Sequence, residues 1–120
     1  MSLLAMAVPI LPGKMEQWRS FVGELNGARR EQFAASRQRM QVHERTFLQP
    51  TPMGDLVIVT LEGADPAEAM RRFVSVDDEF TRWFIQQVVE IHGLDLTRIA
   101  DAPPPELVID SDRRVGLRAA

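Results

Sequence analysis

Two histidines are the side chains in this sequence best suited to acid–base chemistry near neutral pH. His43 stands in the run His43-Glu44-Arg45. Because side chains alternate along a strand, His43 and Arg45 are predicted to share a face from which Glu44 points away. Such a pair could orient an anionic substrate or transfer a proton. The alternative interpretation is an ordinary pair of solvated groups on the face of a sheet.

The second histidine, His92, comes directly before Gly93, where a predicted helix ends. An imidazolium is favoured there by the helix dipole and can bond the last carbonyls, so a capping role is the preferred interpretation. The competing interpretation is a general base in a pocket or an axial haem ligand. No His-x-x-His, His-Glu-x-x-His or carboxylate cluster at ligand spacing supports a haem or metal site. We therefore expect neither a metal nor a cofactor.

Aromatic side chains could form the walls of a pocket for a flat organic ligand, although aromatic stripes at helical spacing are more often simply core. The candidates come from two predicted helices and one predicted strand: Trp18, Phe47, Trp83 and Phe84.

Charged clusters in the sequence have structural explanations as well. The acids from Asp77 to Glu79 stand at a predicted helix start, where capping and the helix dipole favour them. The 28–40 segment is locally basic, and with Arg45 it could receive a carboxylate or phosphate or be a solvated face. Within that segment, Arg30 and Arg37 are predicted to share a face different from that of Phe33.

Composition limits the classes of function. The chain has 120 residues, enough for one domain, and its formal charge of −3 does not favour binding to nucleic acid. Cysteine is absent, which excludes disulfides and thiolate nucleophiles and is consistent with the reducing cytoplasm, where we expect this protein. The apolar run from Leu3 to Leu11 follows no basic residue and is interrupted by Pro9, so neither a secretory signal nor a membrane span is predicted.

The stretch from Val42 to Gly63 is the centre of the predicted fold. It reads VHERTFLQPTPMGDLVIVTLEG, in which two segments rich in β-forming residues flank a Pro-Thr-Pro-Met-Gly turn. The second strand, Asp55 to Glu62, is apolar on both sides, which is typical of a strand covered on both faces. This hairpin is therefore predicted in the middle of a sheet.

The segments before the hairpin predict a strand and one or two helices. The apolar run from Leu3 to Ile10 favours a buried strand, and the helical pattern of apolar residues begins at Lys14. Asn26-Gly27 predicts a left-handed helix stop followed by a second helix over 28–40. One long helix kinked at Gly27 is the alternative.

The segments after the hairpin predict two helices and a last strand. Asp65 is the expected cap of a helix that runs to about Val74, and Ser75 or Asp77 is expected to cap the next, which ends at His92. Glu106 to Asp110 is predicted as the last strand, after a proline-rich loop, and the tail 111–120 is expected to be flexible.

This order, strand-helix-strand-strand-helix-strand, predicts a single α+β domain over 1–110 with a ferredoxin-like βαββαβ antiparallel sheet and helices on one face. The other face of such a sheet would be bare. A second copy of the chain is the simplest cover for it, so we expect a homodimer.

The segments TPMGDLVIVTLEG, the Asp-Pro helix start, DDEFTRWF and EIHG resemble the dimeric α+β barrel superfamily, and within it a group of small bacterial proteins of uncharacterised function. The resemblance covers most of Leu3 to Asp110. It implies a homodimer with a ligand site between sheet and helices or inside the barrel of each protomer. No catalytic motif of the superfamily's monooxygenases, haem-degrading enzymes or isomerases maps onto this sequence, so no catalytic residue follows from it.

Two hypotheses of function remain. The first is a barrel that binds a small organic molecule in a pocket with the four aromatic walls named above, anchored by His43, Arg45 or His92, with or without cofactor-independent monooxygenase-like or isomerase-like catalysis. The second is a non-catalytic structural or regulatory dimer, whose histidines would be structural.

Overall fold

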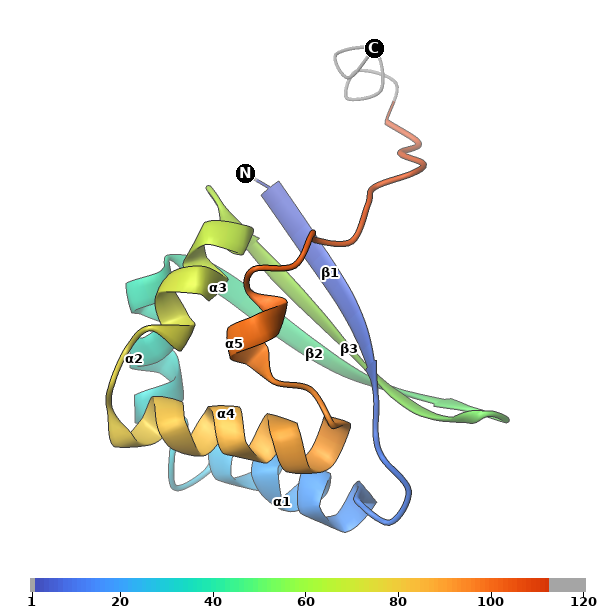
Figure 1. Ribbon diagram of the computed structural model, residues 1–120, viewed down its shortest axis with the longest axis vertical. Coiled ribbons are helices and arrows are strands. Elements are labelled where there is room, and N and C mark those ends of the chain that lie inside the picture. The colour runs from blue at the N-terminus through green and yellow to red at the C-terminus, as the bar shows by residue number, and fades with distance from the viewer. Residues whose placement is uncertain (1, 113–120) are drawn as a thin grey trace.

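The structure, a computed structural model, describes residues 2–112. This part of the chain forms a mixed α+β fold in which the strands form one sheet and the helices pack against it (Figure 1). Its elements in chain order are β1 (Ser2–Pro9), α1 (Met15–Asn26), α2 (Arg30–Met40), β2 (Val42–Thr51), β3 (Gly54–Gly63), α3 (Pro66–Val74), α4 (Glu79–His92) and α5 (Leu96–Ile99).

The sheet is antiparallel, with the strand order β1-β3-β2, so the predicted hairpin and the central place of its second strand are confirmed. Gly63 pairs with Ser2 on one side and with Val42 on the other. The hairpin is longer than expected, because Thr51 still pairs with Gly54 across the turn.

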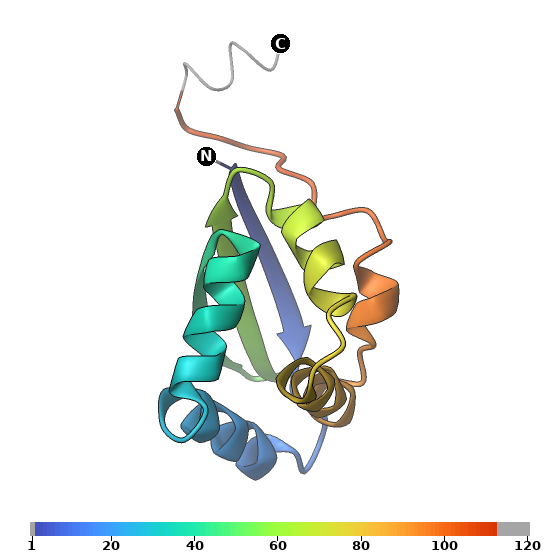
Figure 2. The same cartoon turned by 90° about the vertical axis from the view of Figure 1, so that its left-hand side faces the viewer.

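All of the helices lie on one face of this sheet (Figure 2). On that face Val57 and Leu61 of β3 are each only 2% exposed. On the opposite face Phe47 is 51% exposed, and Leu3 is 64% exposed. The central strand is therefore covered on one face by its own chain, and not on both as its apolar sequence suggested.

The region 15–40 forms two helices and not one kinked helix. Gly27 ends α1 with φ −126° and ψ −106°, so the left-handed stop that we predicted is wrong. A Cβ atom at this position would lie 2.9 Å from the carbonyl oxygen of Gly23. Glycine is needed here because of a close backbone approach and not because of a positive φ.

Side-chain caps begin the helices that follow the hairpin. The Asp65 side chain accepts a hydrogen bond from the amide of Glu68 at 3.1 Å, which confirms the predicted start of α3. Asp78 caps α4 in the same way, and not Ser75 or Asp77 as we predicted. Asp78 has extended backbone angles (φ −134°, ψ 168°), which direct its carboxylate toward the first amides of the helix.

The C-terminal segment differs most from the prediction. Glu106–Asp110 pairs with no strand among residues 2–112, and its central residues Leu107, Val108 and Ile109 are 72%, 76% and 84% exposed. The predicted fourth strand of the βαββαβ order is therefore not formed within residues 2–112. The short helix α5, which we did not predict, precedes it. The predicted flexible tail 111–120 lies outside the described residues from 113 onward.

Candidate functional site

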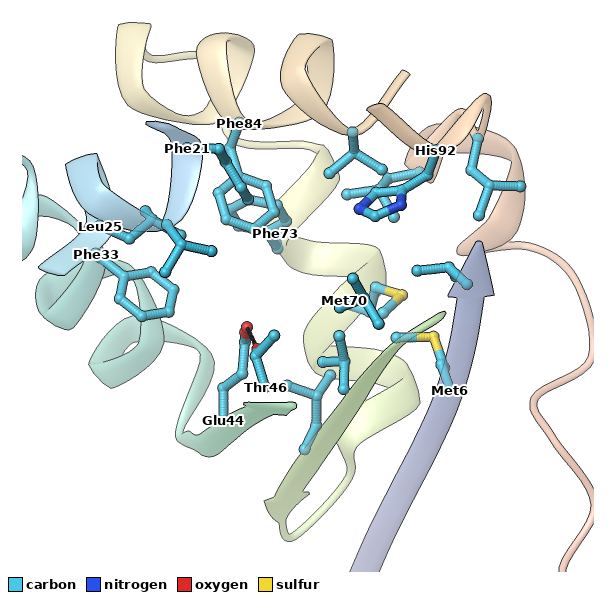
Figure 3. Close-up of a pocket in the computed structure, with 18 of the residues that line it drawn as sticks. Met6, Phe21, Leu25, Phe33, Glu44, Thr46, Met70, Phe73, Phe84 and His92 are labelled. Carbon is cyan, nitrogen blue, oxygen red and sulfur yellow. Dashed lines mark hydrogen bonds between the residues drawn. The ribbon is translucent and has the colours of Figure 1, made fainter. Parts of the chain in front are cut away.

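A cavity of about 320 Å³ lies between the covered face of the sheet and the helices (Figure 3). Every strand and every helix described above contributes to its lining. Its volume falls within the range of small-molecule sites in proteins, roughly 300–1,000 Å³.

The lining is mostly apolar, with aromatic rings from the helices and branched aliphatic side chains from the sheet. Central among the rings is Phe84, whose centroid lies 5.1 Å from that of Phe21 and 5.4 Å from that of Phe73. The polar residues of the lining are few: Asn26, Arg37, Glu44, Thr46 and His92. An apolar wall with a few polar groups binds an organic molecule by its surface and orients it by those groups.

One polar end of the cavity is formed by an ion pair between α2 and β2. Nε of Arg37 donates to Oε1 of Glu44 at 2.7 Å, and the two side chains are only 11% and 9% exposed. Thr46, two residues along the same face of β2, donates from its hydroxyl to Oε2 of Glu44 at 3.1 Å. Both carboxylate oxygens therefore have partners within the chain, as a buried anion requires.

The arginine of this pair is held by aromatic rings. Its guanidinium lies 4.8 Å from the ring centroids of Phe33 and Phe73 and 4.9 Å from that of Phe84. Nη1 also donates to the hydroxyl of Ser36 at 2.9 Å. Cation–π contact with three rings partly replaces the hydration that Arg37 loses on burial. The charge of Glu44 is thus compensated within the wall of the cavity.

The other polar end is His92, at the last residue of α4, and the Glu44 and His92 side chains lie on opposite sides of the pocket (Figure 3). Its Nδ1 lies 2.6 Å from the carbonyl oxygen of Pro9 at the end of β1. A carbonyl oxygen can only accept, so Nδ1 carries a proton. The capping role that we predicted is wrong, since His92 bonds a strand carbonyl and not the last carbonyls of its own helix.

Burial gives this histidine a defined protonation state. The residue is 6% exposed, and burial lowers the pKa of His92 from its ordinary value of 6.5, while the bond to Pro9 opposes that shift more weakly. At neutral pH the imidazole is therefore uncharged, and its Nε2 presents a lone pair. No group within residues 2–112 forms a hydrogen bond to Nε2, and the side chain lines the cavity.

The structure brings together three of the residues that we predicted from the sequence for a pocket. Trp18, Phe84 and His92 all line the cavity. Trp83 lies outside it. Its ring centroid is 5.3 Å from that of Phe21, and the guanidinium of Arg29 lies over the Trp83 ring, 4.1 Å from its centroid.

The three predicted residues of β2 lie away from this cavity. His43, Arg45 and Phe47 share one face of the strand, as the alternation predicted, but it is the face without helices. Arg45 forms an exposed ion pair there with Glu62 of β3. These side chains cannot contact a ligand bound between the sheet and the helices of the same chain.

Three of the four arginines in the basic segment 28–40 are paired with carboxylates, and Arg30 has no such partner within residues 2–112, so the segment does not gather its cations into one anion site. Arg29 binds Glu79 through two hydrogen bonds of 2.8 and 3.1 Å, and Arg39 lies 3.4 Å from Asp78. The pKa of Glu79 is lowered chiefly by its hydrogen bond to Arg29. The acids from 77 to 79 are therefore occupied as helix caps and ion-pair partners.

Sequence reasoning missed the ion pair Arg37–Glu44 and the hydroxyl of Thr46. A signal was present, because Phe33, Arg37 and Met40 have the spacing of one helix face, which places the arginine among apolar neighbours. Glu44 shares a face of β2 with Val42 and Thr46, but the sequence did not show that this face lies under the helices.

Within residues 2–112 no three His, Cys, Asp or Glu side chains are grouped so that they could hold a metal ion. None of the helices there is both long and apolar enough to cross a membrane. A comparison with protein-family models, curated proteins and solved structures finds no match to this chain.

Proposed function

We propose that this protein binds a small organic molecule in the cavity between its sheet and its helices. The observation that carries the proposal is the cavity itself: about 320 Å³ of space with an apolar lining and polar groups at two ends. A core that served stability alone would be filled, since interiors pack to the density of organic crystals. A compensated ion pair and a neutral histidine at the two ends are suited to orienting a ligand.

We further propose that the binding unit is a homodimer of ferredoxin-like protomers, as in dimeric α+β barrels. The support is the face of the sheet that the helices leave open. Across its three strands Ala7, Ile58 and Phe47 are neighbours in register, which makes an apolar strip. A second copy related by two-fold symmetry would cover this strip with an equivalent one.

The exposed segment Glu106–Asp110 is proposed as the fourth strand of that assembly. Its apolar residues have no cover in the single chain, and the outer edge of β1 pairs with no strand among residues 2–112. An unpaired edge and an exposed apolar segment each favour strand addition. The segment would pair with β1 of its own chain or of the partner.

Catalysis is a second candidate function, favoured by the neutral imidazole of His92. A histidine whose Nε2 lone pair faces an apolar cavity can accept a proton from a bound molecule, as a cofactor-independent monooxygenase or isomerase requires. In that case substitution of His92 would lower turnover while stability was retained; a loss of stability without any change in turnover would assign it a structural role.

Native mass spectrometry of the purified protein, with an absorbance spectrum of the same sample, tests both parts of the proposal. We expect a mass near twice 13.6 kDa with additional organic mass bound. A haem or flavin band would contradict the expectation that no cofactor binds. A dimer that binds no organic compound from a screened set would favour the structural or regulatory alternative, and a stable monomer would contradict the dimer.

A further inference from the structure

The hydrogen-bonding state of His92 defines what a bound molecule must offer at that end of the cavity. With Nδ1 donating to Pro9, the neutral ring has one remaining polar atom, Nε2, and that atom can only accept. A ligand group without a hydrogen to donate would leave it unpaired in an apolar environment. The penalty for an unpaired buried acceptor is about 1–3 kcal/mol.

The opposite end defines the charge of the ligand. Glu44 already places a carboxylate in the wall, and Arg37 balances it from 2.7 Å. An anionic ligand would add a second negative charge near Glu44, while the guanidinium is shared between Glu44, Ser36 and three rings. A charge that enters such a cavity without its own counter-ion loses hydration without compensation.

From these two ends we propose that the ligand is a neutral, largely apolar molecule that donates a hydrogen bond from an O–H or N–H group to Nε2 of His92. This inference rests on the proposed function, because it assumes that the cavity is the binding site. It narrows the ligand to neutral molecules with an O–H or N–H group, of which alcohols and phenols are the simplest, and it excludes carboxylates and phosphate esters. It also gives His92 two roles: this residue makes the site prefer a ligand with a hydroxyl group or another such donor, and it holds β1 through its bond to Pro9.

Three matched probes test the inference by isothermal titration calorimetry: 4-hydroxybiphenyl, 4-methoxybiphenyl and biphenyl-4-carboxylate. They share an apolar body and differ in whether the polar group donates a hydrogen bond or carries a charge. We expect 4-hydroxybiphenyl to bind about tenfold more tightly than the methoxy compound, the factor that one well-placed hydrogen bond supplies. The carboxylate is expected to bind most weakly.

In His92→Leu, 4-hydroxybiphenyl and 4-methoxybiphenyl should bind with about the same affinity, and the affinity for 4-methoxybiphenyl should be retained. His43→Leu, at the exposed histidine of the open face, is the matched control and should leave the preference unchanged. If His92→Leu fails to fold, nitrogen-15 NMR of the unmodified protein gives the same information. Nε2 of His92 should then shift on addition of 4-hydroxybiphenyl but not of 4-methoxybiphenyl, and His43 should not respond.

Equal affinity for the hydroxyl and methoxy probes, or tightest binding of the carboxylate, would overturn the inference while leaving the proposed function intact. If none of the three probes binds, the cavity is not a site for molecules of this kind, and the inference falls together with the proposed function.

Discussion

The imidazole of His92 and the carbonyl oxygen of Pro9 are joined at 2.6 Å, which ties the end of α4 to the end of β1 across 83 positions of the chain. This bond sets the tautomer of the histidine, whose side chain lines the cavity. The end of α4 is completed by Gly93, whose φ of 68° lets the chain turn sharply behind the ring. The ends of α4 and β1 thus hold the imidazole of His92 in the wall of the cavity, where it can bind a ligand.

The stability of the protein should depend on pH through His92. Since burial lowers the pKa of the folded-state imidazole below 6.5, the unfolded chain takes up a proton first as the pH falls. The free energy of unfolding should therefore be highest above pH 6.5 and should decrease below it, toward the folded-state pKa. Urea denaturation at pH 7.5, 6.5 and 5.5 measures this change.

His92→Gln is the control for that experiment, because an amide can donate to Pro9 without titrating. The variant should show no decrease between pH 7.5 and 5.5. The carboxylates Asp78, Glu79, Glu90 and Asp95 do not interfere, since their pKa values are lowered and they titrate at more acid pH. The same pH dependence in both proteins would show that another group is responsible.

Glu44→Gln should destabilise the fold strongly. It removes the negative partner of a buried arginine, and breaking such a pair from one side costs about 3–5 kcal/mol. Glu68→Gln at the exposed pair with Arg71 on α3 is the matched control and should cost less than about 1 kcal/mol. Chemical denaturation of both variants compares them. Similar small effects in the two would mean that Arg37 does not depend on Glu44 for its charge compensation.

Phe47→Glu should convert the proposed dimer into a monomer. The residue is 51% exposed on the open face, on β2 beside Ile58 of the central strand, and a carboxylate there would be buried without a partner in a two-fold interface. Sedimentation velocity measures the change. Met53→Glu, at the 97% exposed tip of the hairpin, is the control and should remain dimeric. If Phe47→Glu is still a dimer, the interface is not this face of the sheet.

Hydrogen exchange in residues 106–110 should show whether this segment becomes a strand. In the dimer we expect its backbone amides to exchange slowly, as paired amides do. In monomeric Phe47→Glu the protection should persist if the segment pairs with its own β1 and disappear if it pairs with the partner. Rapid exchange in the wild-type dimer would contradict a fourth strand of either kind.

The sequence predicted well those features that are set by local chemistry. The Asp65 cap, the end of α4 at Gly93 and the two strands of the hairpin all follow from side chains close in sequence. The partition of β2 into two alternating faces was also confirmed. Which of those faces lies under the helices was not predictable, because both sets mix polar and apolar residues. For that reason His43 and Phe47 were assigned to a pocket that they do not line.

Two other errors concern the second polar end of the cavity and the last strand. Arg37 was placed on a different face from Phe33, although a spacing of four residues puts both on one face of a helix. Its burial also depends on Glu44 and on rings from three helices, which meet only in the folded chain. Glu106–Asp110 was predicted as the last strand from its apolar residues, but a strand also needs a paired neighbour, and within residues 2–112 this segment has none. Of the predicted site, His92 and two aromatic walls lie at the cavity, while its second polar end was found only in the structure.

The most direct test of ligand binding in the cavity is a titration of protein carrying carbon-13 methyl-labelled methionine with 4-hydroxybiphenyl, followed by NMR. Met6, Met40 and Met70 line the cavity, and Met53 stands 97% exposed at the hairpin tip as an internal control. The methyl signals of the three cavity methionines should shift together and saturate, while that of Met53 stays in place. Unchanged signals of the three cavity methionines, or shifts confined to Met53, would contradict binding between the sheet and the helices.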